Sequence, residues 1–308
     1  MNKVRQSNLE LCRALSMFMI LMLHANFVAL GIPSKSDLDF STTNVFNRFF
    51  LESLSVSSVN VFVLISGWFG IRPSLKGVFK FIYQILFFLG LGYIISLCLG
   101  YTKFSFSSIA DIIQLSSSDW FIKSYFVLMI LSPILNNYIN LEIHIQDMIL
   151  FCFIVFEVVF GWIGGGSRFF VSGFGPLHLI GIYLAGQYLH YTLPSRDGLF
   201  KKLLSLRPSY DLIIYVLFSL ITAIFGIMVL KFIGKPLTHY TLAYNSPFVI
   251  GASIYFFMFF CKKEIPFIRI VNWLGASSFA VYLFHGEYTV RHLLFIPLIK
   301  FFYYRDVL

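Results

Sequence analysis

The sequence is short of charge. Only 12% of its 308 residues are charged, whereas 58% are hydrophobic, and soluble domains usually carry about 25% charged residues. So few charges cannot cover the surface of a water-soluble protein of this length. The composition therefore excludes the soluble classes and indicates a protein that lies in a membrane.

Signatures of several enzyme classes are missing as well. The sequence holds no HExxH zinc motif, no GxSxG serine-hydrolase turn and no GxxxxGK[ST] phosphate loop. Its four cysteines are scattered, without a CxxC pair. We therefore expect no metal site, no serine-hydrolase centre and no disulfide framework.

Apolar runs recur along the whole chain, and runs of about 20 residues are long enough to cross the hydrocarbon core of a bilayer. Short connections that contain proline and serine separate them, and neither a soluble domain nor an internal repeat is visible. The sequence thus predicts an all-α, polytopic transmembrane bundle that forms one domain over residues 1–308. Its nine predicted spans lie near residues 11–30, 49–69, 78–99, 120–138, 148–163, 171–190, 211–233, 246–261 and 273–297.

The basic residues set the expected orientation. The net charge is +9, but Lys and Arg are spread over many short loops, which points to anionic lipid headgroups rather than to nucleic acid. Their clusters near residues 72–80, 196–207 and 262–269 fall on one side of the predicted topology. Because basic loops tend to stay in the cytoplasm, we expect a cytoplasmic N-terminus and, after nine spans, an external C-terminus.

The first predicted span carries two ionisable side chains, Arg13 near its start and His24 inside it. An α-helix places residues with this spacing roughly 16 Å apart along its axis with about 20° of offset, and therefore on one face. Such groups are costly in a bilayer and are tolerated mainly where they face the bundle interior or a wet cavity. The alternatives are snorkelling of Arg13 to the headgroups and a plain interhelical hydrogen bond of His24. The shared face favours a polar path in which Arg13 holds an anionic cosubstrate and His24 acts as a general base.

An ordered set of segments resembles one enzyme family. The set comprises Arg13 and His24 after NLEL, then VNVFVLISGWFGIRPS (59–74), DWFIKSYFVLMILSPIL (119–135), YNSPFVI (244–250) and SSFAVYLFHGEYTVR (277–291). In this order it is similar to acyltransferase family 3 over nearly the whole chain. The resemblance implies a bacterial inner-membrane protein that moves acyl groups, mostly acetyl, from cytoplasmic acyl-CoA to sugars of surface or lipid-linked polysaccharides.

The resemblance also implies roles for individual residues. His24 would be the catalytic base or would accept the acyl group itself, with Arg13 assisting it. The anionic part of acetyl-CoA would be held by Arg13, Arg72 and Lys76. Relatives carry two arginines three residues apart after the second span, whereas this chain follows Arg72 with lysines, which lack the bidentate fork for phosphate. The family's tenth helix has no counterpart after the ninth predicted span.

Three more residues are expected on the acceptor side of the site. His285 matches the family's YLxH segment, with a packing histidine as the alternative. Trp120 would stack on a sugar ring or else belong to the interfacial aromatic belt. Glu287 and Arg291, four residues apart, would contact the sugar or else pair with each other along one helix. Glu157, inside the fifth span, is a further functional candidate for which the sequence names no partner.

Two other functions stay open at this point. A transporter or flippase of lipid-linked sugars would use Arg13 and His24 for gating or proton coupling, but the missing repeat and the scarcity of acids within the spans disfavour it. A catalytically silent scaffold for glycan-assembly enzymes is excluded only by activity data.

Overall fold

Helices are the only regular elements in the described part of the chain. The structure, a computed structural model, describes residues 6–114, 120–164, 171–195 and 198–305, and no strand occurs among them. Asp119 and Arg196, which the sequence analysis used in a family segment and in a charge cluster, lie outside these residues. The prediction of an all-α membrane bundle is confirmed.

The main helices follow the predicted spans closely. They are α1 (Ser7–Leu23) with the π-helix η1 (His24–Ala29), α3 (Thr42–Val56), α4 (Ser58–Phe69), α5 (Leu75–Cys98), α7 (Trp120–Leu135), α8 (Ile143–Phe156) with the π-helix η3 (Glu157–Ile163), α9 (Pro176–Ser195), α11 (Pro208–Ile233), α13 (Pro247–Cys261) and α14 (Arg269–Gly286). Shorter pieces connect them: α2 (Lys35–Phe40), α6 (Phe106–Ile113), the 3₁₀ turns η2 (Asn136–Asn140) and η4 (Val171–Gly173), α10 (Lys201–Leu204) and α12 (Thr238–Thr241).

Six helical segments of the described chain are long and apolar enough to cross a membrane. They are Ser7–Ala29, Thr42–Phe69, Leu75–Cys98, Trp120–Asn140, Ile143–Ile163 and Pro208–Ile233. The other predicted spans are helical too, as α9, α13 and α14, but they do not meet that criterion of length and composition. The structure therefore supports a multi-pass membrane protein, and six described segments rather than the nine predicted meet the criterion for a membrane span.

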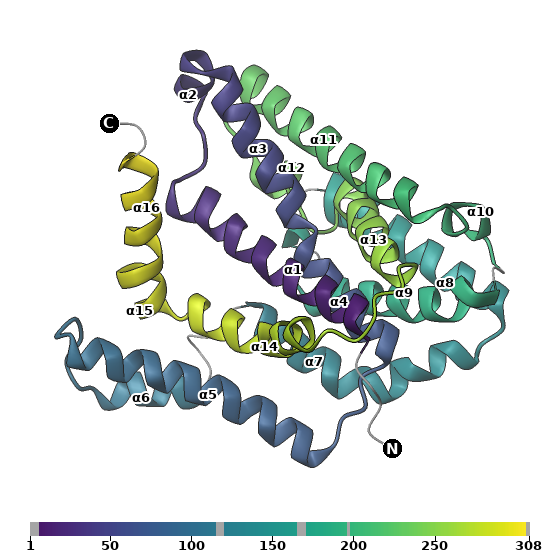
Figure 1. The fold of residues 1–308 in the computed structure, drawn as a ribbon, viewed down its shortest axis with the longest axis horizontal. Helices are drawn as coiled ribbons and strands as arrows, with labels where there is room; N and C mark the ends of the chain where they lie inside the picture. The colour runs from purple at the N-terminus through teal and green to yellow at the C-terminus, as the bar shows by residue number, and fades with distance from the viewer. Residues whose placement is uncertain (1–5, 115–119, 165–170, 196–197, 306–308) are drawn as a thin grey trace.

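The ninth predicted span, 273–297, is wrong as a single helix. The backbone of Glu287 is extended (φ −63°, ψ 134°), and its carboxylate accepts the N–H of Val290 at 2.9 Å, so a new helix begins there. That helix runs through α15 (Tyr288–Val290), the π-helix η5 (Arg291–Phe295) and α16 (Ile296–Arg305), and it leaves the direction of α14 (Figure 1). This helix is not among the described segments that are long and apolar enough to cross a membrane, so the absence of a tenth span stays a prediction.

Small residues let the central helices pack closely. A Cβ atom on Gly67 of α4 would overlap the backbone carbonyl of Tyr183 on α9, and one on Gly186 would overlap the carbonyl of Leu64. In a membrane, close contact of this kind supplies much of the helix–helix attraction, because the lipid is as apolar as the side chains. The largest buried apolar cluster lies around these two helices together with α1 and α13.

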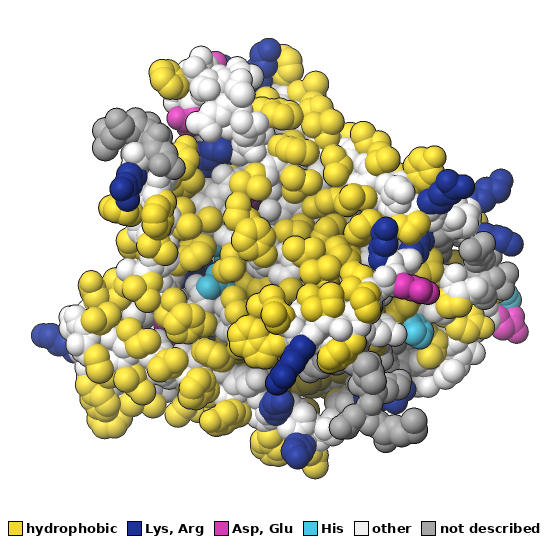
Figure 2. Space-filling model, viewed as in Figure 1, with side chains coloured by type: hydrophobic (Ala, Val, Ile, Leu, Met, Phe, Trp, Pro, Cys, Tyr) yellow, Lys and Arg dark blue, Asp and Glu magenta, His cyan; other side chains and the backbone are white. Residues whose placement is uncertain are grey.

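The surface has the pattern expected for lipid contact. Large apolar side chains are exposed along α5, α8 and α11, and hydrophobic atoms cover the middle of the visible face while charged groups lie mostly towards its margins (Figure 2). On one edge, α5 and α6 stand apart from the central helices, and α5 meets α14 and α15 (Figure 1). This arrangement leaves a cavity among α1, α5, α7 and α14.

Candidate active site

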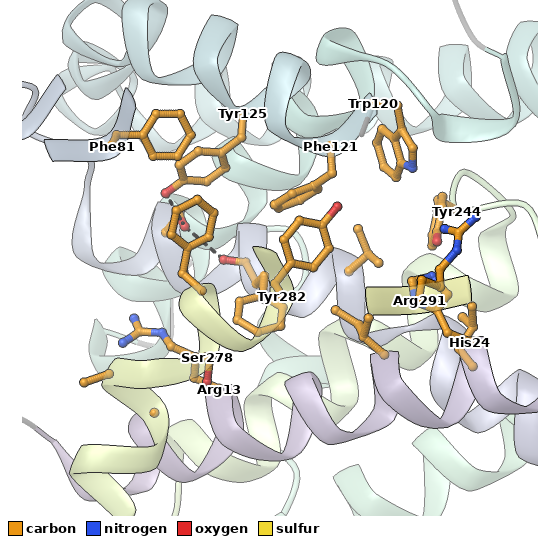
Figure 3. A pocket seen from close by; sticks show the side chains of 18 residues that line it. Arg13, His24, Phe81, Trp120, Phe121, Tyr125, Tyr244, Ser278, Tyr282 and Arg291 are labelled. Atoms are coloured by element: carbon orange, nitrogen blue, oxygen red, sulfur yellow. Dashed lines mark hydrogen bonds between the residues drawn. The ribbon is translucent and has the colours of Figure 1, made fainter. Parts of the chain in front are cut away.

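One cavity of about 460 Å³ brings together residues from distant parts of the chain (Figure 3). Its volume is in the range of small-molecule sites. Its walls come from α1, η1, α4, α5, α7, α14, η5 and the segment before α13. The lining residues are Arg13, Ile20, Leu23, His24, Val59, Phe62, Ser66, Phe81, Trp120, Phe121, Tyr125, Tyr244, Gly275, Ala276, Ser278, Phe279, Tyr282 and Arg291.

Arg13 and His24 line this cavity together, as the helical spacing predicts. Figure 3 draws Arg13 at one end of the cavity and His24 at the other. The Nη1 atom of Arg13 lies 2.9 Å from Oε2 of Glu10, one turn earlier on α1. A Cβ atom on Gly275 would overlap that carboxylate, so glycine at this position lets α14 approach α1. The remaining N–H groups of Arg13 leave donors for a ligand.

His24 is held by a second histidine from α14. Its Nδ1 atom lies 2.8 Å from Nε2 of His285, and Nδ1 of His285 lies 3.0 Å from the carbonyl oxygen of Val281. The carbonyl can only accept, so Nδ1 of His285 donates to it, and Nε2 of a neutral His285 then accepts a hydrogen bond from Nδ1 of His24. This chain leaves Nε2 of His24 with its lone pair, and the described residues provide no hydrogen-bond partner for that atom. A histidine in this state can take a proton from a substrate.

Hydrogen bonds from Arg48 on α3 hold the backbone around His24 in place. His24 is the first residue of the π-helix η1, and π-helical turns are frequent at functional sites. The Arg48 guanidinium donates to the side-chain oxygen of Asn26 at 3.0 Å, to its backbone carbonyl at 2.9 Å and to the carbonyl of Gly31. The Asn26 amide in turn donates to the buried Glu52 carboxylate at 2.8 Å. This network satisfies the carbonyls that a π-helix end leaves open and fixes the turn that carries His24.

Aromatic side chains form much of the rest of the wall. Trp120 contacts Phe174 and Tyr244, with ring centroids 4.8 and 5.6 Å apart, and Phe121 stacks on Tyr125 at 5.7 Å. The Tyr125 hydroxyl lies 3.1 Å from the Ser66 hydroxyl. The ring of Trp120 lines the cavity, and its stacking on a sugar stays a prediction. Amphipathic rings with polar tips suit a ligand that is partly apolar and partly hydroxylated.

Four residues predicted for the site do not line the cavity. Arg72 and Lys76 are exposed in the connection between α4 and α5 and at the start of α5. His285 stands behind His24 and touches the cavity only through it. Glu287 caps the helix that starts at Tyr288, and its carboxylate packs on Gly92 of α5, where a Cβ atom would overlap it.

A second buried histidine lies away from the cavity. His178 on α9 is 2% exposed, its Nε2 atom lies 3.0 Å from Oδ1 of Asn60, and its Nδ1 atom lies 3.4 Å from Oε2 of Glu157. The amide of Asn60 donates to the carbonyl of Tyr244 at 3.0 Å. Glu157 is the first residue of the π-helix η3 and is fully buried. The partner that the sequence could not name for Glu157 is thus His178.

Sequence reasoning missed several residues that shape the site. Arg48 and Glu52 were not singled out, and only their polarity within an apolar span marks them. Tyr244 and Tyr282 entered only as parts of the family segments 244–250 and 277–291. Arg291 was considered as a sugar contact or as a partner of Glu287, and it lines the same cavity as His24. Among the described residues that line the cavity, none is acidic, whereas two are arginines. The site therefore suits a ligand with negative charge.

In the described part of the chain, no group of three or more His, Cys, Asp or Glu side chains is placed so that it could hold a metal ion.

Comparisons with known proteins show which family the chain belongs to. A family model described as an acyltransferase domain matches residues 6–306, which is nearly the whole chain. Neither a curated protein nor a solved structure matches it.

Proposed function

Because the chain belongs to this acyltransferase family and is a multi-pass membrane protein, we propose that it transfers an acyl group from cytoplasmic acyl-CoA to a sugar hydroxyl. The acyl group is acetyl, and the acceptor is a sugar of a lipid-linked or surface polysaccharide. The protein lies in the inner membrane of a bacterium with its N-terminus in the cytoplasm. The observation that carries this proposal is the open Nε2 atom of His24 on the same cavity as Arg13.

The donor enters at the Arg13 end of the cavity. Arg13 stands near the N-terminal end of α1, and its unpaired N–H groups bind the anionic part of CoA through charge-assisted hydrogen bonds. The distance along α1 from Arg13 to His24 is bridged by the extended thioester arm of the donor. Arg72 and Lys76, which are exposed on the loop before α5 and on its first turn, attract the phosphates before the donor enters.

His24 then acts as the general base. Its Nε2 atom takes the proton of the acceptor hydroxyl while that oxygen attacks the thioester carbonyl, so a C–O bond forms and the C–S bond breaks. The proton passes from Nε2 to the departing thiolate, which leaves as free CoA. His285 stabilises the imidazolium that forms in between, because its Nε2 atom accepts from Nδ1 of His24. Trp120 stacks on the sugar ring at the cavity wall.

The proposal is tested with purified protein in proteoliposomes, radiolabelled acetyl-CoA and an extract of lipid-linked glycans. The wild type is expected to move label into the glycan fraction, and His24→Ala to do so about 10²–10⁴-fold more slowly, the usual contribution of a general base. Donor binding by both proteins, measured by thermal shift, is the control. A wild type without transfer, as expected of a flippase or a scaffold, contradicts the function; equal transfer by both proteins contradicts the role of His24.

A further inference from the structure

Arg291 lines the cavity, but the proposed reaction gives it no role. It is the first residue of the π-helix η5, just as His24 opens η1. It lines the same cavity as His24, and Figure 3 shows both side chains at the same end of that cavity, opposite Arg13. Its position is therefore beyond the thioester, on the side from which an acceptor must approach His24.

The charge of Arg291 is not neutralised within the described residues. Its Nε atom is buried and has no hydrogen-bond partner, and no ion pair of its guanidinium is found. The acid at the right spacing on the same helix, Glu287, turns back to accept the N–H of Val290 and packs on Gly92. The two arginines of the cavity thus differ, because Arg13 has a carboxylate 2.9 Å away and Arg291 has none.

An unpaired guanidinium inside a membrane protein is costly unless a ligand or water supplies the missing partner. The lining holds no acidic side chain that could serve. The donor's phosphates are already placed at the Arg13 end, so they cannot also reach Arg291. The anionic partner of Arg291 would then be a group on the acceptor.

We propose that Arg291 is the anion-binding residue of the acceptor site and selects an acceptor that carries an anionic oxygen group. This inference rests on the proposed function. The group is a carboxylate on the sugar or a phosphate that links the sugar to its lipid carrier, and a guanidinium recognises both through two parallel N–H donors. Binding of this anion also fixes the sugar so that one hydroxyl meets Nε2 of His24.

The test compares three acceptors: methyl glucoside, methyl glucuronide and an isoprenyl phosphate carrying glucose. Wild type, Arg291→Gln, Arg291→Lys and Lys300→Gln are assayed with acetyl-CoA. Lys300 is a matched control, because it is an exposed cation on the same terminal helix. Loss of charge-assisted hydrogen bonds is expected to raise the KM of Arg291→Gln for an anionic acceptor about 10- to 100-fold. Its KM for acetyl-CoA and its kcat and KM for methyl glucoside stay unchanged, and Arg291→Lys is intermediate.

A second readout needs no turnover. Millimolar methyl glucuronide or the isoprenyl phosphate should raise the melting temperature of the wild type and of Lys300→Gln but not of Arg291→Gln. The anion with the larger shift identifies the source of the charge. Equal loss of kcat with neutral and charged acceptors, or an unchanged Arg291→Gln, overturns the inference while the acyltransferase function stands. If the wild type transfers nothing but still gains the charge-dependent shift, the proposed function fails and the anion site remains.

Discussion

Two buried histidines in this bundle have opposite surroundings. His178 has a carboxylate, Glu157, at 3.4 Å and an amide on its other nitrogen, and it is sealed between helices. His24 has no carboxylate partner in the described residues, only another histidine, and it faces the cavity. A histidine beside an acid resembles a catalytic pair more closely than a histidine beside a histidine does.

The comparison indicates that the access of a substrate to a ring nitrogen decides the role of a buried histidine more than the residue to which the histidine is bonded. Nε2 of His178 lies 3.0 Å from Oδ1 of Asn60, and Nδ1 is buried 3.4 Å from Glu157 without a hydrogen bond, so burial keeps substrate atoms from both nitrogens. His24 obtains the same tautomer control from the carbonyl of Val281 through His285 that an acid would give, and it keeps Nε2 open. We therefore propose that His178 stabilises the fold and that His24 takes part in the reaction.

The largest effect on stability is expected at the sealed site. His178→Leu leaves the Glu157 carboxyl buried without the one close partner that the described residues give it, and breaking a buried pair in this way costs about 3–5 kcal/mol. The loss should appear as a lower melting temperature in detergent. His24→Leu, measured in the same way, should change it little, because its side chain borders a cavity.

A double variant sharpens the first prediction. Replacing both partners, as Glu157→Leu with His178→Leu, removes the stranded charge and should recover part of the lost stability. Glu157→Gln, whose amide can donate to Nδ1 of His178, should cost less than His178→Leu. If His178→Leu melts like the wild type, the sealed site has no structural role and the contrast with His24 is wrong.

The next effect concerns donor binding at the open site. Arg13→Gln removes the charge that holds the anionic part of CoA, and a lost charge-assisted hydrogen bond of about 1.5–3 kcal/mol raises the KM for acetyl-CoA about 10- to 100-fold. The melting temperature should change much less than in His178→Leu. Arg13→Lys keeps the charge and should restore part of the affinity. A KM unaffected by Arg13→Gln would place the donor elsewhere.

The smallest effect is expected at His285. His285→Leu removes the acceptor for Nδ1 of His24, and loss of one hydrogen bond of about 1 kcal/mol or somewhat more lowers kcat by roughly tenfold. The KM for acetyl-CoA should not change, because His285 does not line the cavity. His285→Gln offers a carbonyl oxygen to the same N–H and should be closer to the wild type. Equal activity of His285→Leu and the wild type would show that His24 needs no orientation.

Local periodicity was enough to predict the helical bundle and the shared face of Arg13 and His24, because both depend on residues within one helix. The break at Glu287 was missed because the apolar residues before His285 and after His292 together have the length of one span, and only the cap formed with Val290 reveals the new helix. The partner of His24 lies 261 residues away in the sequence. Pairings over such distances are set by helix packing, so neither His285 nor the Glu157–His178 pair could be found from spacing.

Chemical modification of the histidines tests the central claim most directly. Diethyl pyrocarbonate reacts with an accessible, unprotonated imidazole nitrogen, and mass spectrometry of the digested protein reports each histidine separately. We predict that His24 is modified, that acetyl-CoA protects it, and that His178 stays unmodified in the folded protein. His144, whose side chain is 71% exposed, should react equally with and without acetyl-CoA. Modification of His178 before His24, or a His24 that acetyl-CoA does not protect, would contradict the account.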